Sequence, residues 1–116
     1  QVRPGARLNN VGGAVQSLAE KAGYGVVRDL VGHGVGYQVH EDPEIYHYRI
    51  GERSAANIEL KEGMVICIEP MINAGTYKIE VAENGFTIVT ADKSLSAHFE
   101  HTLAVTKDAY EILTLE

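Results

Sequence analysis

Met64-Val-Ile-Cys-Ile-Glu-Pro-Met-Ile72 is the stretch that decides the fold, because a strictly apolar run leads directly into a carboxylate and a proline. The run predicts a β-strand over 64–72. Alternation along a strand places Glu69 on the same face as Val65 and Cys67. Pro70 has no N–H to donate, so it ends the ladder or marks an edge strand. We therefore expect the Glu69 carboxylate to lie at the lip of a sheet.

One helix is predicted upstream of this strand. Apolar residues recur there at spacings of three and four, which places on one helical face Leu8, Val11, Val15, Leu18 and Ala22. We expect the helix to start near Asn9, with Asn9 or Asn10 capping its first turn, and to end at Gly23.

The chain after Gly23 has the pattern of β-structure. Strands are predicted over 24–28, 64–72, 77–81, 86–90, 98–106 and 110–115, with Asn84-Gly85 as a hairpin turn. The segment Glu44–Leu60 is polar and lacks a helical or strand period, which indicates a long surface connection. These elements predict one α+β domain over residues 1–116, with one main helix packed on an antiparallel sheet.

Composition excludes several classes of partner. The formal net charge is −6 and no stripe of Lys and Arg is present, so we expect no nucleic-acid partner. The longest apolar run, 64–68, is far shorter than the roughly 20 residues of a membrane helix, so no membrane association is expected. The single cysteine, Cys67, cannot form an internal disulfide and is typical of a reducing, cytoplasmic compartment. Its simplest interpretation is a buried strand thiol.

Two histidines are candidates for chemistry. His33 stands between Gly32 and Gly34, so no flanking Cβ prevents a metal, water or substrate from approaching the imidazole. The competing interpretation is an ordinary loop histidine bonded to the backbone. His40, beside Glu41, is equally consistent with an exposed surface histidine.

Two carboxylates complete this inventory. Glu100 is predicted to lie mid-strand with His98 and Thr102 on its face, and no Lys or Arg is near it in sequence. Glu69, if it is more than a surface strand end, faces Glu100 across one strand pair and shares a cation with it. One imidazole with two carboxylates suits Mn, Fe, Co or Zn. No Gly-x-Ser-x-Gly elbow, phosphate loop or dinucleotide fingerprint is present.

Four motifs in order carry a family resemblance: Gly-His-Gly-Val-Gly at 32–36, His-Glu-Asp-Pro at 40–43, Gly-Met-Val-Ile-Cys-Ile-Glu-Pro-Met at 63–71 and Ser-Ala-His-Phe-Glu-His-Thr at 96–102. With them, the segment from Gln1 to Leu115 resembles the C-terminal half of type I methionine aminopeptidases. The resemblance implies a "pita-bread" fold of two pseudo-symmetric halves. It also implies a metallopeptidase that removes the N-terminal methionine of nascent polypeptides.

The resemblance also implies roles for individual residues. His33 and Glu69 correspond to ligands of one metal, and Glu100 to a ligand that bridges both metals. Glu69 would shuttle the proton of the attacking water, and His40 would contact the substrate. Val39 and Phe86 stand at positions that line the methionine pocket. Two divalent ions (Co, Mn, Fe or Zn) are implied for the complete enzyme.

The chain departs from the family pattern in three respects. Val39 replaces a frequent phenylalanine and His98 a frequent glutamine. The family's two aspartate ligands, about a dozen residues apart, belong to an N-terminal half, and no such arrangement is formed by Asp29, Asp42, Asp92 and Asp108. We therefore expect this chain to supply three of five ligands and to be inactive without the missing half. The alternatives are a non-catalytic module that binds a protein partner, and a self-associating half.

Overall fold

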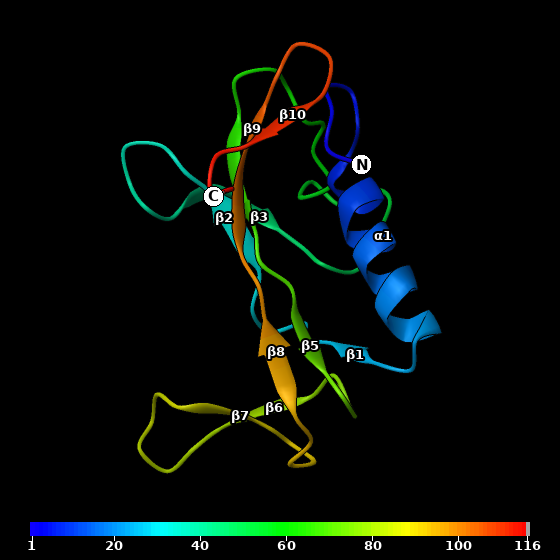
Figure 1. Ribbon diagram of the computed structural model, residues 1–116, viewed down its shortest axis with the longest axis vertical. Coiled ribbons are helices and arrows are strands. Elements are labelled where there is room, and N and C mark those ends of the chain that lie inside the picture. Colours follow the sequence, from blue (N-terminus) through cyan, green and yellow to red (C-terminus); the bar gives the residue numbers. More distant parts are fainter. Residues whose placement is uncertain (116) are drawn as a thin grey trace.

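A computed structural model describes residues 1–115, and it places one face of a five-stranded antiparallel sheet against a single described helix, α1 (Leu8–Lys21) (Figure 1). The order β10-β9-β4-β2-β3 runs across this sheet, which contains β2 (Gly32–Gly34), β3 (Glu41–Ile45), β4 (Val65–Ile68), β9 (His101–Val105) and β10 (Tyr110–Ile112). The α+β prediction, with one helix on an antiparallel sheet, is confirmed.

Two smaller sheets extend from the first one. A three-stranded sheet, ordered β1-β5-β8, contains β1 (Gly25–Val26), β5 (Met71–Asn73) and β8 (Ser96–His98). The hairpin of β6 (Ile79–Val81) and β7 (Ile88–Thr90) lies beyond it, at the bottom of Figure 1. Its turn contains Asn84-Gly85 as predicted, with Gly85 at a φ of 80° that favours glycine.

Both long strands of the prediction are broken in the structure. The predicted strand over 64–72 divides at Glu69-Pro70 into β4 and β5, and that over 98–106 divides at Phe99-Glu100 into β8 and β9. The two breaks lie at one level, because Ile68 pairs with His101 on one side of them and Met71 with His98 on the other. Pro70 supplies no N–H to continue the ladder. The expectation that Glu100 lies mid-strand is therefore wrong, since it lies at the junction of two sheets.

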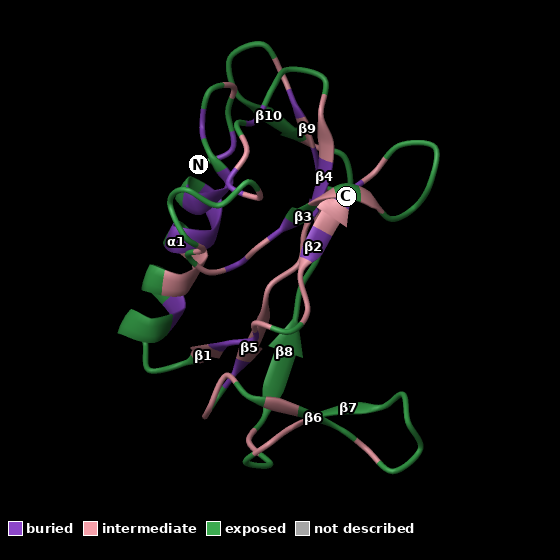
Figure 2. Cartoon of the chain, turned by 180° about the vertical axis from the view of Figure 1, so that it is seen from behind, coloured by how far each residue is buried: buried purple, intermediate pink, exposed green. Residues whose placement is uncertain are grey.

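The helix agrees with its prediction at its start but not along its second half. The Asn10 side chain accepts the Arg7 N–H at 2.8 Å and so caps the first turn, whereas buried Asn9 bonds the backbone of Ile50. Leu18, expected on the buried face, is 76% exposed. The second half of α1 extends past the core, and Figure 2 shows its far end as exposed, so periodicity alone misplaced that residue.

The segment Glu44–Leu60 is not only a surface connection. It begins in β3 and contains four buried residues: Ile45, His47, Asn57 and Leu60. It packs closely on α1, where a Cβ at Gly12 would meet the Tyr46 carbonyl oxygen at 2.6 Å. Asn57 Oδ1 also accepts the Asn9 N–H at 3.0 Å. Polar side chains that are buried through such hydrogen bonds give no hydrophobic period, which explains the wrong prediction.

The core lies between α1 and the five-stranded sheet. Its buried residues come from α1 and the segment before it, from the Glu44–Leu60 segment and from β4 and β9: Val2, Ala6, Leu8, Val11, Ile45, Leu60, Ile66, Leu103 and Val105. In the part of the chain that the structure describes, α1 is neither long nor apolar enough to cross a membrane.

Candidate metal centre

His33 is placed by the interior strand β2, which pairs with β3 on one side and β4 on the other. The strands approach so closely that a Cβ at Gly32 would collide with the Cys67 carbonyl oxygen. The flanking glycines are thus required by the neighbouring strands, and this adds a structural reason to the open approach predicted for the imidazole. His33 and Cys67 are direct partners in the register, so their side chains share one face of the sheet.

Glu69 lies between two imidazoles. Its Oε1 is 3.2 Å from His33 Nε2 and its Oε2 is 3.2 Å from His98 Nε2. The side chains of His33 and Glu69 are only 14% and 13% exposed. This contact joins β2 to the β4–β5 break and brings together one imidazole and one carboxylate, and the role of the two groups as metal ligands stays a prediction. His98, predicted from the sequence to share a face with Glu100 but not to contact Glu69, is the second imidazole.

The tautomer of His33 favours a cation beside Glu69. His33 Nδ1 lies 2.9 Å from the Gly34 carbonyl oxygen, so Nδ1 carries the hydrogen of this bond. In the neutral ring Nε2 then presents a lone pair to the Glu69 carboxylate at 3.2 Å. The Nε2 lone pair and the carboxylate oxygen are both hydrogen-bond acceptors, and at 3.2 Å they repel each other unless a proton or a metal ion lies between them. The donor set of this site therefore fits a divalent metal.

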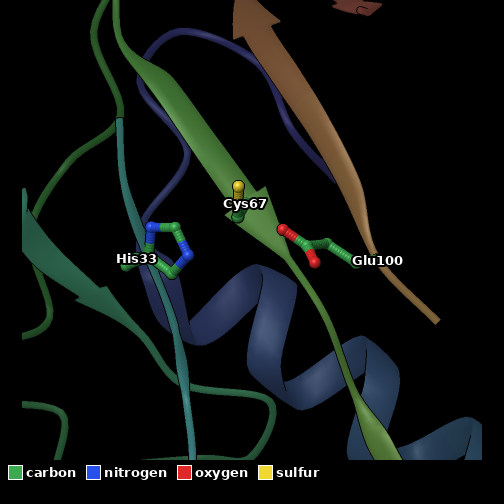
Figure 3. Close-up of side chains that lie close together, drawn as sticks. All are labelled: His33, Cys67 and Glu100. Carbon is green, nitrogen blue, oxygen red and sulfur yellow. The ribbon is translucent and has the colours of Figure 1, made fainter. Parts of the chain in front are cut away.

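Glu100 and Cys67 extend the cluster along the same face of the sheet. Two groups have ligand atoms within 4.8 Å of one another: one of His33, Cys67 and Glu100, the other of Glu69, His98 and Glu100. Figure 3 shows Cys67 between His33 and Glu100. Within residues 1–115 neither Glu69 nor Glu100 is ion-paired to Lys or Arg. The partly buried Glu69 thus lacks the Lys or Arg that usually neutralises such an acid.

The Cys67 thiol lies in a polar environment. Its Sγ is 3.3 Å from Thr102 Oγ1, the direct partner of Cys67 on β9. Burial raises the pKa of Cys67, the hydrogen bond from Thr102 opposes this, and the negative charges of Glu100 and Glu69 add to the increase. The thiol is therefore protonated at neutral pH when no cation is present.

His47 supports Glu69 from the Glu44–Leu60 segment. Its Nε2 accepts the Glu69 N–H at 3.1 Å, and its side chain is fully buried. Burial, with a smaller contribution from the charge of His98, lowers the pKa of His47 to about 4, so the ring is neutral and able to accept this bond. Nothing in the sequence pattern of this segment pointed to His47.

A cleft of about 490 Å³ opens beside the cluster. The side chains around it include His33, His40, Glu69, Phe86 and His98. The His40 ring centroid is 4.2 Å from that of His33, although strict alternation along a strand would have separated them. The reason is a β-bulge at His33/Gly34, followed by the loop that ends at β3.

The two predicted pocket residues differ in their placement. Phe86 precedes β7 and lines the cleft, although its side chain is 78% exposed. Val39 is 72% exposed and is not one of the described residues around the cleft. Its role in a substrate pocket stays a prediction.

Comparison with known proteins places this geometry in a family. The family model described as metallopeptidase family M24 matches residues 1–107. The chain belongs to metallopeptidase family M24. Membership in this family implies the use of divalent metal, which agrees with the donor set around Glu69.

Relatives within M24 share both sequence and fold with the chain. Methionine aminopeptidase B of Synechocystis is 49% identical over 115 residues, which cover 99% of this chain and 41% of that protein. The crystal structure of a methionine aminopeptidase from Thermotoga maritima matches with a TM-score of 0.92 and 44% identity over 100% of this chain and 45% of the other. The prolidase of Pyrococcus horikoshii matches with a TM-score of 0.68 and 28% identity, over 99% of this chain and 26% of that structure.

These matches also define how much of a family member is present. The chain has the fold of the C-terminal half of the pita-bread architecture, as the four motifs predict. It spans less than half of the length of the methionine aminopeptidases that it matches.

Proposed function

We propose that this chain provides the C-terminal part of a methionine aminopeptidase, which hydrolyses the peptide bond after an N-terminal methionine. One observation carries the proposal: the Glu69 carboxylate lies 3.2 Å from each of two imidazoles, at the wall of a cleft that also contains His40. Similarity to M24 proteins of that name supports the choice of substrate.

His33, Glu69 and Glu100 would hold the metal, with two divalent ions (Co, Mn, Fe or Zn) in the whole protein. A bound divalent ion would polarise the scissile carbonyl and lower the pKa of a water molecule. His98 contacts the second oxygen of Glu69 and so fixes the orientation of its carboxylate. His47 fixes the backbone of Glu69 through its N–H.

Two side chains would carry out the proton transfer and the charge stabilisation. Glu69 accepts the proton of the attacking water and passes it to the leaving amine, acting first as general base and then as general acid. His40, held against the His33 ring at 4.2 Å, donates a hydrogen bond to the carbonyl oxygen as that oxygen gains negative charge. Both groups line the same cleft, so one bound peptide can reach them together.

The methionine side chain would occupy the apolar end of this cleft. Met71, Phe86 and Ile88 line it and offer the soft, partly aromatic surface that a thioether prefers. Phe86 and Ile88 are 78% and 43% exposed, so this wall lacks an opposite side in the described structure. We infer that a further protein surface encloses the substrate and supplies the remaining metal ligands.

The upstream part of the whole protein is the surface that we propose for this role. In its absence a second copy of the chain would cover the exposed apolar side chains, since patches of this kind seldom stay in contact with water. Sedimentation velocity at increasing concentration checks this expectation. A strictly monomeric profile at high concentration would contradict the self-association.

The activity is tested by joining the upstream part of the Synechocystis relative to the N-terminus of this chain. We expect the joined protein, but not the chain alone, to release methionine from a Met-Ala peptide when Mn²⁺, Fe²⁺ or Co²⁺ is supplied. The same joined protein with Glu69→Gln is the matched control and should be inactive. A folded, metal-loaded joined protein without activity would refute the proposal. Release from an Xaa-Pro peptide instead would indicate a prolidase.

A further inference from the structure

Cys67 has a position that packing alone does not explain. It is 3% exposed, yet it lies outside the packed apolar cluster between α1 and the sheet, which Ile66 joins from the opposite face of β4. The neighbours of its thiol are the Thr102 hydroxyl at 3.3 Å, the His33 imidazole and the Glu100 carboxylate. A thiol that served only to fill the core would lie among aliphatic side chains instead.

The register of the strands fixes this arrangement. Cys67 lies directly opposite His33 on β2 and opposite Thr102 on β9, so the three side chains form one row across the sheet. The ligand atoms of His33, Cys67 and Glu100 all lie within 4.8 Å of one another, and Figure 3 shows the three groups around one space. An imidazole, a thiol and a carboxylate are together a mixed N, S, O donor set.

A donor set with sulfur selects different ions from a set without it. Zn²⁺ is bound by Cys, His and carboxylate ligands, and three protein ligands with one open position are typical of zinc sites that keep a water. Soft thiolate favours thiophilic ions over Mn²⁺ or Mg²⁺, which prefer oxygen. The second group, Glu69, His98 and Glu100, has no sulfur and suits the harder ions.

We propose that this chain binds one thiophilic divalent ion, such as Zn²⁺ or Cd²⁺, through His33, Cys67 and Glu100. The thiol proton passes to the solvent as the metal–sulfur bond forms. All three ligands belong to this chain, so binding does not require upstream residues. Glu100 is shared with the second group, and His33 and Glu100 are both ligands of the proposed peptidase centre, so a thiophilic ion competes there for two of its ligands. The inference rests on the proposed metal centre but not on peptidase activity.

The test is a titration of the chain with Co²⁺ under reducing, oxygen-free conditions. We expect a thiolate-to-cobalt charge-transfer band in the near ultraviolet. Cys67 is the only cysteine of the sequence, so the band identifies its sulfur as the ligand without any variant. Cd²⁺ should displace Co²⁺ and abolish the band. Co²⁺ binding without the band would overturn the proposal, and so would a lack of binding.

Variants give an independent check of the ligand set. Cys67→Ser should lower Cd²⁺ affinity by at least about tenfold, the smallest loss usual even for groups that only support a metal ligand. His33→Ala should do the same. His101→Ala is the matched control, because His101 faces the other side of the sheet and contacts Thr114. The Cd²⁺ affinity of this variant should equal that of the unaltered chain. Equal Cd²⁺ affinity in Cys67→Ser and the unaltered chain would refute the role of the thiol.

The two proposals fail separately. If the joined protein releases methionine but the chain shows no thiolate band, the peptidase proposal stands and the thiophilic site is refuted. If the band appears but the joined protein is inactive with every metal, the site stands and the peptidase proposal fails.

Discussion

The five-stranded sheet has two faces of opposite chemistry, although the same strands build both. Toward α1, Ile66 and Leu103 lie in a buried apolar core. On the other face, Cys67 and His33 belong to the cluster of metal-ligating groups. Successive residues of β4 alternate between the two faces. A slip of one residue would exchange the faces, so the packing of the core fixes the position of the site.

The two faces also differ in what they contribute to stability. The core face removes aliphatic surface from water and stabilises the fold. The other face places Glu69 and Glu100 near each other without a Lys or Arg partner in the described chain, which costs free energy in the absence of a metal. We therefore expect changes on one face to affect stability and changes on the other to affect metal binding and activity.

The largest expected effect is on the site face. Glu100→Gln in the joined protein should lower methionine release by about a thousandfold, roughly 4 kcal/mol, because a metal ligand is lost. The free energy of unfolding of the metal-free protein should change by less than about 0.5 kcal/mol, since Glu100 is exposed. Peptide assays and urea unfolding measure the two quantities.

Glu111→Gln is the control for this prediction, because it neutralises an exposed carboxylate on β10. It should leave both quantities unchanged. A loss of stability in Glu100→Gln as large as its loss of activity would show that the two faces are not independent.

The core face is tested by Ile66→Ala. Ile66 is completely buried, and the lost methylene groups with the remaining cavity should lower the free energy of unfolding by about 3 kcal/mol. Val65→Ala, on the half-buried opposite side of the same strand, should cost clearly less. Urea unfolding of both variants measures the difference. Equal losses would mean that both faces contribute similarly to the packing.

His47 is buried and bonds the backbone of Glu69, so it connects the packing of the chain with the site. The pH dependence of the free energy of unfolding tests this connection. His47 has a pKa of about 4 in the folded chain, against about 6.5 when unfolded. Between these values the unfolded chain binds a proton that the folded chain does not, so stability falls as the pH decreases. We expect the metal-free chain to lose about 2 kcal/mol between pH 8 and pH 5 from this group.

Urea unfolding at both pH values, with a chelator present, measures this loss. His47→Gln keeps an acceptor for the Glu69 N–H but does not titrate, so the variant should lack this part of the pH dependence. An unchanged pH dependence in the variant would assign the loss to other groups.

The smallest effect is expected on α1. Leu18→Ala should change the free energy of unfolding by less than about 0.5 kcal/mol, because its side chain is 76% exposed. Leu8→Ala, at a completely buried position in the first turn of the helix, should cost about 3 kcal/mol. Thermal or urea unfolding distinguishes them. A similar cost for both leucines would restore the buried face that periodicity predicts.

Sequence reasoning recovered the general architecture and part of the cluster. The apolar period of 8–22 located α1, and the run before Glu69 located β4, because both patterns depend on local side-chain spacing. The prediction that His33, Glu69 and Glu100 gather is consistent with the structure, although their roles as ligands stay proposals. This prediction depended on the order of the four motifs. The local sequence around His33 alone left two interpretations, a metal ligand or an ordinary loop histidine.

Other features did not follow from local patterns. The break at Phe99-Glu100 has no proline and becomes visible only when β8 and β9 are seen to pair with β5 and β4. His47 is buried by contacts with distant residues, and its segment has no hydrophobic period. Cys67 was interpreted as an ordinary buried thiol, because the sequence does not show that His33 and Thr102 lie on either side of it.

The sequence by itself thus determined where α1 and β4 form, and which side chains of β4 share a face, because these depend on spacing along one chain. Only the tertiary structure decided what each face meets. Strand register placed His33 and Thr102 beside Cys67, and the two aligned strand breaks brought Glu69 and Glu100 to one junction. Contacts between residues far apart in sequence depend on pairing and packing of whole elements, which no local pattern records.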